Sequence, residues 1–108
     1  MDKKREIPVG QKIPVVIDRE IQDLVPTFFE NRRKDIERIR EALIQNDFET
    51  VEILGHGMKG CGKGYGFDEV SGIGESLELA AEKKDKREVE ECIQRLIGYL
   101  EHVEIVYQ

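Results

Sequence analysis

The spacing of apolar residues predicts that most of the chain folds into helices. The first long helix is expected from Pro26 onward, because proline suits the first turn of a helix. Its apolar positions recur at helical intervals, and they are Phe29, Ile36, Ile39 and Leu43. A shorter helix, from a cap at Asp18 to Leu24, is expected just before it. The polar run "ENRRKD", residues 30–35, is interpreted as a solvated face of the long helix.

Three further apolar stripes follow at helical spacing, and Asp47 and Asp85 are expected to cap two of the helices. The second helix, taken as residues 47–62, would bury Phe48, Val51, Leu54, Met58 and Cys61. The third would bury Val70, Ile73, Leu77, Ala80 and Ala81, and the last Val89, Cys92, Ile93, Leu96, Leu100 and Val103. The predicted fold class is all-α: an antiparallel up-down four-helix bundle with an additional short N-terminal helix.

The two ends of the chain have a different pattern from this helical region, which covers residues 18–103. Residues 1–17 contain two prolines and a glycine and are expected to be extended, as is the tail 104–108. The segment "VEIVY" alternates and is rich in β-branched residues, so it could pair with "IPVVI", residues 13–17. Such pairing would tie the two ends together.

Composition and charge narrow the class of protein. A chain of 108 residues is one domain, and its formal net charge of −6 argues against nucleic acid or an anionic membrane as the main partner. No apolar run approaches the roughly 20 residues of a membrane span, and the first residues lack the apolar core of a signal peptide. Cys61 and Cys92 make no disulfide framework and are expected in the core. We expect a cytoplasmic monomer with reduced thiols.

A run of six glycines lies within "ILGHGMKGCGKGYGFDE", residues 53–69, and it matches two nucleotide-binding patterns. Residues 55–60 fit G-x-G-x-x-G, and residues 57–63 fit the beginning of a P-loop. However, Gly64 stands where a P-loop needs Ser or Thr to hold Mg²⁺. Residues 67–108 are also mostly helical by pattern, which leaves no parallel sheet for a Rossmann unit. Nucleotide binding is therefore kept only as an alternative.

A helical reading of the same run places His56 on the outer face. With Leu54 at 0° and about 100° per residue, His56 falls near 200°, Lys59 near 140° and Lys63 near 180°. The imidazole would therefore stand in solvent beside two lysines. His56 and Cys61 would point about 140° apart, which argues against a metal site.

The glycines divide between two flanks of this helix. Gly57, Gly60 and Gly64 flank the histidine on one side and would leave the imidazole uncovered. Gly55 and Gly62 lie on the other flank, where they would let a neighbouring helix approach closely. Each glycine inside a helix costs about 1 kcal/mol relative to alanine, so this arrangement needs a functional or packing reason.

The cleared flank and the lysines suit an imidazole that is transiently phosphorylated. Neutral histidine, with a pKa near 6.5, is a good nitrogen nucleophile at neutral pH. A phosphoryl group adds about two negative charges, and a lysine three residues later could offset part of them, by roughly 1 to 4 kcal/mol depending on solvation. Glycine four residues after the histidine removes a side chain that would crowd the phosphoryl group.

The segment "LGHGMKGCGKGYGFDEVSGIGESLE", residues 54–78, resembles the signature of histidine-containing phosphotransfer (HPt) domains. That signature reads H-x-x-K-G, then a glycine several residues on, then a helix containing Leu-Glu. The matching positions are His56, Lys59, Gly60, Gly66, Leu77 and Glu78. The region upstream also resembles the helix that leads into such domains, so the similarity covers roughly residues 18–101.

The resemblance implies a phosphoryl carrier rather than an enzyme. His56 would be the phosphoacceptor, Lys59 would orient and neutralise the phosphoryl group, and Gly60 would give clearance, with Lys63 in support. Glu78 is a supporting residue where many relatives have Gln, and its charge would repel phosphate unless it bonds the other imidazole nitrogen. The partners would be response-regulator receiver domains, a hybrid histidine kinase, or both. No intrinsic cofactor or metal is implied, because Mg²⁺ is expected on the receiver domain.

Several assignments around this site stay open at the level of sequence. Gly57, Gly64 and Tyr65 are candidates for partner docking, although Tyr65 and Phe67 could instead staple the turn into the core. The glycines could end the helix near Gly62 or Gly64, which would move Lys63 off the helical face that it shares with His56. The run 30–35 could steer acidic receiver domains, and His102, between Glu101 and Glu104, is expected on the surface. The alternative function is a non-phosphorylated docking or inhibitory module for a kinase or receiver domain.

Overall fold

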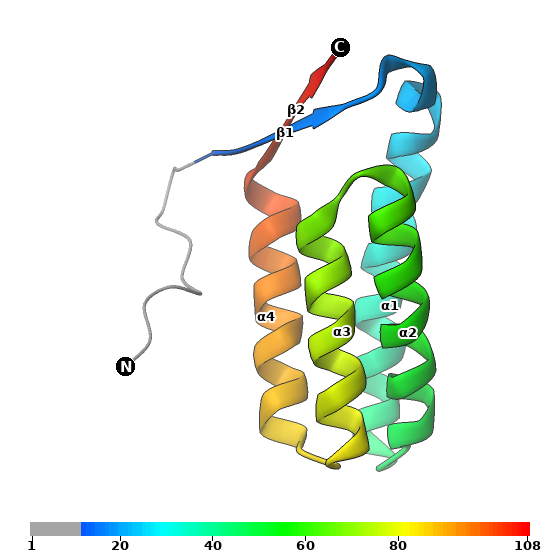
Figure 1. Ribbon diagram of the computed structural model, residues 1–108. Helices are drawn as coiled ribbons and strands as arrows, with labels where there is room; N and C mark the ends of the chain where they lie inside the picture. The colour runs from blue at the N-terminus through cyan, green and yellow to red at the C-terminus, as the bar shows by residue number, and fades with distance from the viewer. Residues whose placement is uncertain (1–11) are drawn as a thin grey trace.

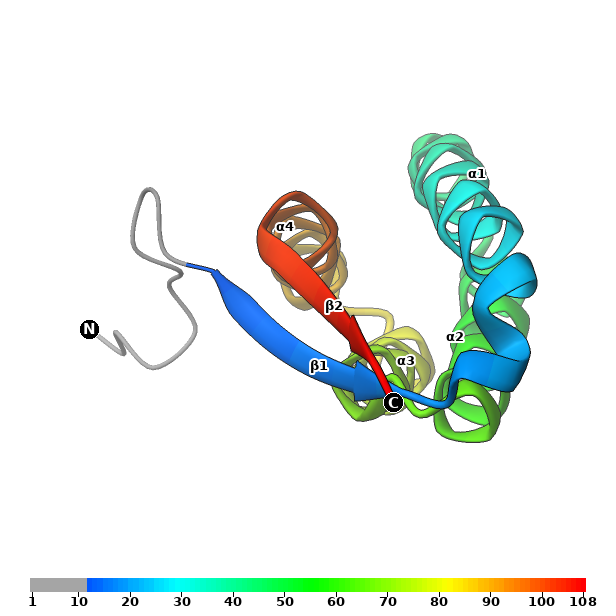
Figure 2. The ribbon, with the colours of Figure 1, turned by 90° about the horizontal axis from the view of Figure 1, so that it is seen from above.

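Four helices form the body of the protein in the computed structural model, which describes residues 12–108. They are α1 (Val25–Ile44), α2 (Phe48–Tyr65), α3 (Asp68–Glu82) and α4 (Lys86–His102). In Figure 1 the chain runs down α1, up α2, down α3 and up α4, and Figure 2 shows the four helices surrounding a common centre. The predicted helical bundle is confirmed.

Capping side chains set the beginnings of α2, of α4 and of the short helix that precedes α1. The Asp47 carboxylate accepts a hydrogen bond from the Thr50 backbone N–H at 3.1 Å, and Asp85 does the same for Glu88 at 3.1 Å, as predicted for both caps. Asp18 accepts from the Glu20 N–H at 2.9 Å. It begins a 3₁₀ helix, η2 (Arg19–Leu24), that runs directly into α1. The additional N-terminal helix is therefore a short 3₁₀ extension of α1.

A two-stranded parallel ribbon joins the ends of the described chain. Strand β1 (Ile13–Ile17) pairs with β2 (Val103–Tyr107), with Ile13 opposite Val103 and Ile17 opposite Tyr107. The all-α prediction is wrong in this respect, because β-branched residues favour strand over helix once α4 has ended. The pairing considered for these segments is present, and Ile17 is buried against the bundle. The extended segment predicted for residues 1–17 lies partly, at 1–11, outside the described residues.

The core runs the length of the bundle and ends in an aromatic cluster. Its fully buried members of largest volume are Tyr99, Phe67, Ile17, Ile39, Met58, Ile73, Leu77, Ile93 and Leu96. At the end of the bundle near the ribbon, the Phe28 ring stacks on Phe67 with centroids 4.8 Å apart. Of the two adjacent phenylalanines near the start of α1, Phe28 is buried and Phe29 is only partly buried, so the buried position lies one residue from the predicted one.

The polar run of α1 is not wholly solvated, which corrects the interpretation of residues 30–35. Arg32 and Asp35 are each only 9% exposed. They lie four and seven residues after Phe28, on the same helical face, so the backbone carries them inward together. Their charges therefore have to be satisfied inside the bundle, between α1 and α2.

Candidate functional site

Helix α2 continues through the whole glycine run. It ends at Tyr65, and Gly66 closes it in the left-handed conformation, φ 88°, that glycine adopts at little cost. An earlier end near Gly62 or Gly64 is excluded. Lys63 consequently stays on the helix, where its side chain is exposed.

One set of glycines brings the backbones of α2 and α3 together. A Cβ added at Gly74 would lie 2.5 Å from the Lys59 backbone nitrogen and 2.6 Å from the Gly55 carbonyl oxygen. A Cβ at Gly62 would lie 2.6 Å from the Ser71 nitrogen. No real side chain fits at such distances, so these glycines are required by the close approach. The packing predicted for Gly55 and Gly62 is confirmed, and Gly74 is their counterpart on α3.

A second set of glycines leaves the outer face of α2 open. A Cβ added at Gly57, Gly60 or Gly64 would meet nothing within 4 Å, and all three residues are exposed. They lie on the same side of the helix as His56. A partner can therefore approach the imidazole without meeting side chains from these positions.

The imidazole of His56 is exposed and held by one carboxylate. Its side chain is 76% exposed, and its Nδ1 lies 2.9 Å from Oε2 of Glu78, which is only 20% exposed. Glu78 projects from α3 and reaches His56 because the helices pack so closely at Gly55. A carboxylate can only accept a hydrogen bond, so the contact favours the tautomer with its proton on Nδ1. In that tautomer the free lone pair is on Nε2, in a side chain that is mostly exposed.

Lys59 has its own contacts with α3. Its ammonium nitrogen lies 3.9 Å from Oε2 of Glu75, and both side chains are about half exposed. The Ser71 hydroxyl donates a 2.7 Å hydrogen bond to the Lys59 backbone carbonyl. Lys63 has no ion pair with any residue in the described part of the chain. Ser71 and Glu75 were not predicted from the sequence. The signal for Glu75 is its spacing: it lies three residues before Glu78, just as His56 lies three residues before Lys59.

Several carboxylates lie close together where the start of α2 packs against the end of α3. Partial desolvation raises the pKa of Glu52, and the neighbouring carboxylates of Glu82, Glu78 and Glu49 raise it further. The surface around His56 is therefore divided: acidic toward the start of α2 and basic, at Lys59 and Lys63, toward its end. His56 lies at this boundary.

The aromatic residues after the glycine run pack inward. Phe67 is fully buried, so the docking-rim interpretation is wrong for it and the staple interpretation is right. Tyr65 is half-buried, with its ring centroid 4.9 Å from that of Phe28. Part of the Tyr65 side chain still reaches the surface, and its docking role remains a prediction.

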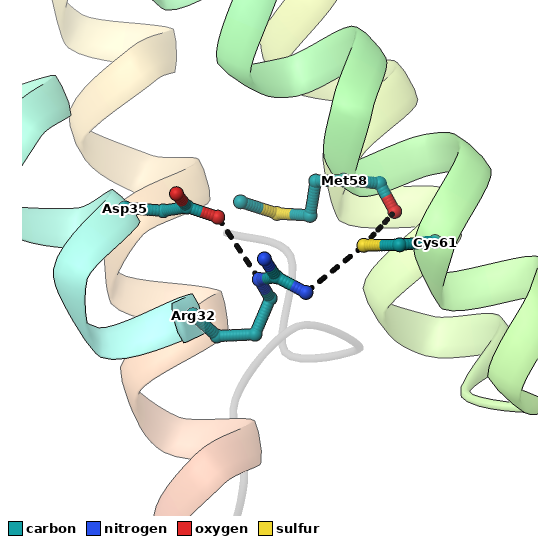
Figure 3. Close-up of polar contacts among 4 residues, drawn as sticks. All are labelled: Arg32, Asp35, Met58 and Cys61. Carbon is teal, nitrogen blue, oxygen red and sulfur yellow. Dashed lines mark hydrogen bonds and ion pairs between the residues drawn. The ribbon is translucent and has the colours of Figure 1, made fainter. Parts of the chain in front are cut away.

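Helix α2 packs against α1 differently from the way it packs against α3. Glycines bring α2 and α3 together, whereas a buried polar network lies between α2 and α1 (Figure 3). The Arg32 guanidinium donates from Nε to Asp35 at 2.9 Å and from Nη1 to the Cys61 sulfur at 2.9 Å. The thiol in turn contacts the Met58 carbonyl oxygen at 3.7 Å. Burial raises the pKa of the Asp35 carboxyl and of the Cys61 thiol, although Arg32 opposes both shifts. The guanidinium also lies 4.7 Å from the Phe28 ring centroid.

Three further residues were singled out in the sequence, and they are the two cysteines and His102. Cys92 is buried as expected, whereas Cys61 is only partly buried. His102 is half-buried rather than fully on the surface, and its Nδ1 lies 2.7 Å from the Gly98 carbonyl oxygen. Within residues 12–108, no helix has the length and apolar character needed to cross a membrane.

Comparison with known proteins agrees with this arrangement of an exposed histidine on a helical bundle. No curated protein and no solved structure matches the chain significantly. The family model of the Hpt domain matches residues 23–105, which is most of the chain and includes all four helices but the last strand only in part. The protein therefore belongs to the Hpt domain family, the histidine phosphotransfer carriers of two-component signalling.

Proposed function

We propose that this domain is a phosphorelay intermediate, which accepts a phosphoryl group on His56 from a receiver-domain aspartate and passes it to another receiver domain. One observation carries the proposal: His56 is 76% exposed on a glycine-cleared face, and its Nδ1 is bound to Glu78 at 2.9 Å. The free nitrogen, Nε2, is thereby directed at an incoming partner.

Phosphoryl acceptance needs no proton transfer to or from solvent. The Nε2 lone pair attacks the phosphorus of the aspartyl phosphate, and the bond from phosphorus to the aspartyl oxygen breaks. The aspartate leaves as a carboxylate with the bonding electron pair. The Nδ1 proton stays on the ring, and the resulting positive charge lies beside the Glu78 carboxylate, which stabilises it.

Onward transfer is the same exchange in reverse. A carboxylate oxygen of the second receiver domain attacks phosphorus, the bond to Nε2 breaks, and its electron pair returns to the ring. Glu78 would hold Nδ1 throughout, so that the ring keeps one orientation. This role resolves the repulsion expected of a carboxylate here, because Glu78 faces the nitrogen that does not carry phosphate.

Lys59 and Gly60 serve the phosphoryl group itself. The Lys59 ammonium offsets part of its charge, by roughly 1 kcal/mol if the pair is fully solvated. Gly60 keeps the space beyond the imidazole open, and Lys63 adds positive charge one turn further along α2.

The partner completes the chemistry. Mg²⁺ and the acid–base groups would be supplied by the receiver domain, which would dock against Gly57, Gly64 and the exposed part of Tyr65. All the site side chains come from one chain, so a monomer would be sufficient, and the cytoplasm is the location proposed for it.

The proposal is tested with receiver domains phosphorylated by a radioactive small-molecule phosphodonor. Transfer should place label on this domain, and the label should be lost in acid and stable in base, as expected of phosphohistidine. His56→Gln should abolish labelling, whereas His102→Gln, which changes the other histidine, should not. Label that survives acid, or that persists in His56→Gln, would refute the proposal.

A docking or inhibitory module that never carries phosphate is the second candidate. The carboxylates around Glu52 favour it, because they oppose a second anion beside His56. Such a module would bind its kinase or receiver domain equally well after His56→Gln. Undiminished inhibition by that variant, with no labelling of the wild type, would select this function.

A further inference from the structure

We propose that Glu75 lowers the stability of phosphorylated His56 by competing with the phosphoryl group for Lys59, and so keeps the domain a ready phosphoryl donor. This inference rests on the proposed phosphorelay function. It assigns a tuning role to a residue of α3 that touches neither the imidazole nor the phosphorus.

Two pairs of side chains with the same spacing connect α2 and α3. His56 and Lys59 are three residues apart on α2, and Glu78 and Glu75 are three residues apart on α3, in the opposite order. Glu78 Oε2 lies 2.9 Å from His56 Nδ1, and Glu75 Oε2 lies 3.9 Å from Lys59 Nζ. The glycine contact between Gly74 and the Lys59 backbone holds the two helices at this short separation.

The two carboxylates nevertheless differ in what they can do. Glu78 is mostly buried and bonds the nitrogen that does not react, so phosphorylation leaves its contact intact. Glu75 is 59% exposed and pairs loosely with an ammonium that is itself 46% exposed. In the described part of the chain this is the one ion pair that Lys59 makes, so Glu75 is the group that the phosphoryl oxygens would have to displace.

The displacement is easy, but the negative charge of Glu75 remains nearby. Exposed ion pairs are weak and exchange readily, so Lys59 can turn to a phosphoryl group that carries about two negative charges. Glu75 then still attracts Lys59 and repels the phosphoryl oxygens. Both effects destabilise the phosphorylated form relative to the free form and favour transfer onward.

The decisive variant is Glu75→Gln, which keeps the size of the side chain and removes its charge. With a phosphorylated receiver domain as donor, the equilibrium ratio of phosphorylated to free carrier should rise about 1.4- to five-fold over wild type, the range typical of an exposed ion pair. The gain should shrink at high salt, because surface charges are then screened. A merely structural role for Glu75 would give no such salt dependence.

A double-mutant cycle tests whether Lys59 mediates the effect. In a Lys59→Met background, Glu75→Gln should change the equilibrium by less than it does in wild type, since the shared partner is gone. An undiminished change would show direct repulsion alone and would overturn the competition for Lys59.

Glu88→Gln is the matched control. It removes one negative charge and a Lys–Glu pair, Lys83 to Glu88 at 2.9 Å, at the α3–α4 turn and away from the site. This variant should transfer phosphate as wild type does. If Glu75→Gln also behaves as wild type, the role of Glu75 is refuted while labelling of His56 still supports the relay. If wild type takes no label at all, the relay function itself fails.

Discussion

Helix α2 is held on one side by glycines and on the other by a buried arginine. Toward α3, Gly55, Gly62 and Gly74 let backbone meet backbone, and the polar contacts of the seam lie at the surface. Toward α1, the gap is filled by side chains, with Arg32 between Asp35 and Cys61. The first contact tolerates no added atom, whereas the second depends on buried charges. The two sides should therefore fail in different ways when they are mutated.

The largest effect is expected on the arginine side. Arg32→Met should destabilise the fold by about 3–5 kcal/mol, because it leaves the buried Asp35 carboxyl without its ionic partner. Urea unfolding followed by circular dichroism measures this loss. The double variant Arg32→Met/Asp35→Leu should recover much of it, since no charge then remains buried.

The deficit of Arg32→Met should also depend on pH. Burial already raises the pKa of Asp35, and removal of Arg32 should raise it further. A carboxyl whose pKa is higher in the folded state than in the unfolded state favours folding at low pH, and that benefit is lost as pH rises through the folded-state pKa. The deficit should therefore be smaller near pH 4 than at pH 7. A deficit that is the same at both would contradict a buried carboxylate as its cause.

The second-largest loss of stability is expected where α2 packs against α3 through glycines. Gly74→Ala should cost about 1–3 kcal/mol through steric overlap with the α2 backbone, in spite of the better helix propensity of alanine. By pushing α3 away, it should also lengthen the contact between His56 and Glu78, which NMR detects as a change at the His56 ring nitrogens. Unchanged stability would mean that the helices do not pack as closely as the structure has them.

An alanine on the open face of α2 should raise the stability of the fold, whereas an alanine at Gly74 should lower it. Gly60→Ala should stabilise the fold by about 1 kcal/mol, because the added methyl group meets nothing and alanine favours the helix. The same methyl group should slow transfer from a receiver domain, which single-turnover labelling measures. A variant that is more stable and accepts phosphate as fast as wild type would show that transfer does not depend on the open space at Gly60.

The smallest effect is expected at Tyr99, away from both sides of α2. Its hydroxyl is buried without a hydrogen-bond partner among the described residues, and burial raises its pKa to about 12. Tyr99→Phe should therefore be neutral or stabilising by up to about 1 kcal/mol. A clear loss of stability would reveal a partner of the hydroxyl, such as a bound water.

Helical periodicity predicted the four helices, the outward position of His56 and the two flanks of glycine, because each depends on angles within one helix. It could not predict Arg32 and Asp35 as buried, since charged residues are normally assigned to the surface and only their spacing from Phe28 points inward. It also could not predict the pairs across helices. The contact of Lys59 with Glu75 depends on the register of α2 against α3, which Gly55 and Gly74 set together.

The pairing of the two strands is a second contact between distant residues that the local sequence could suggest but not decide. Their β-branched alternation was visible, but parallel pairing joins residues about ninety positions apart, as in Ile13 with Val103. Nothing local distinguishes such a pair from two extended tails. Burial of Ile17 against the bundle is the tertiary contact that decides it.

The most direct test of the account is to find which atom carries phosphate. Long-range proton–nitrogen NMR of the phosphorylated, ¹⁵N-labelled domain distinguishes the two ring nitrogens of His56. The account predicts phosphorus on Nε2, with a proton retained on Nδ1 beside Glu78. Phosphorus on Nδ1, or on any residue other than His56, would contradict it.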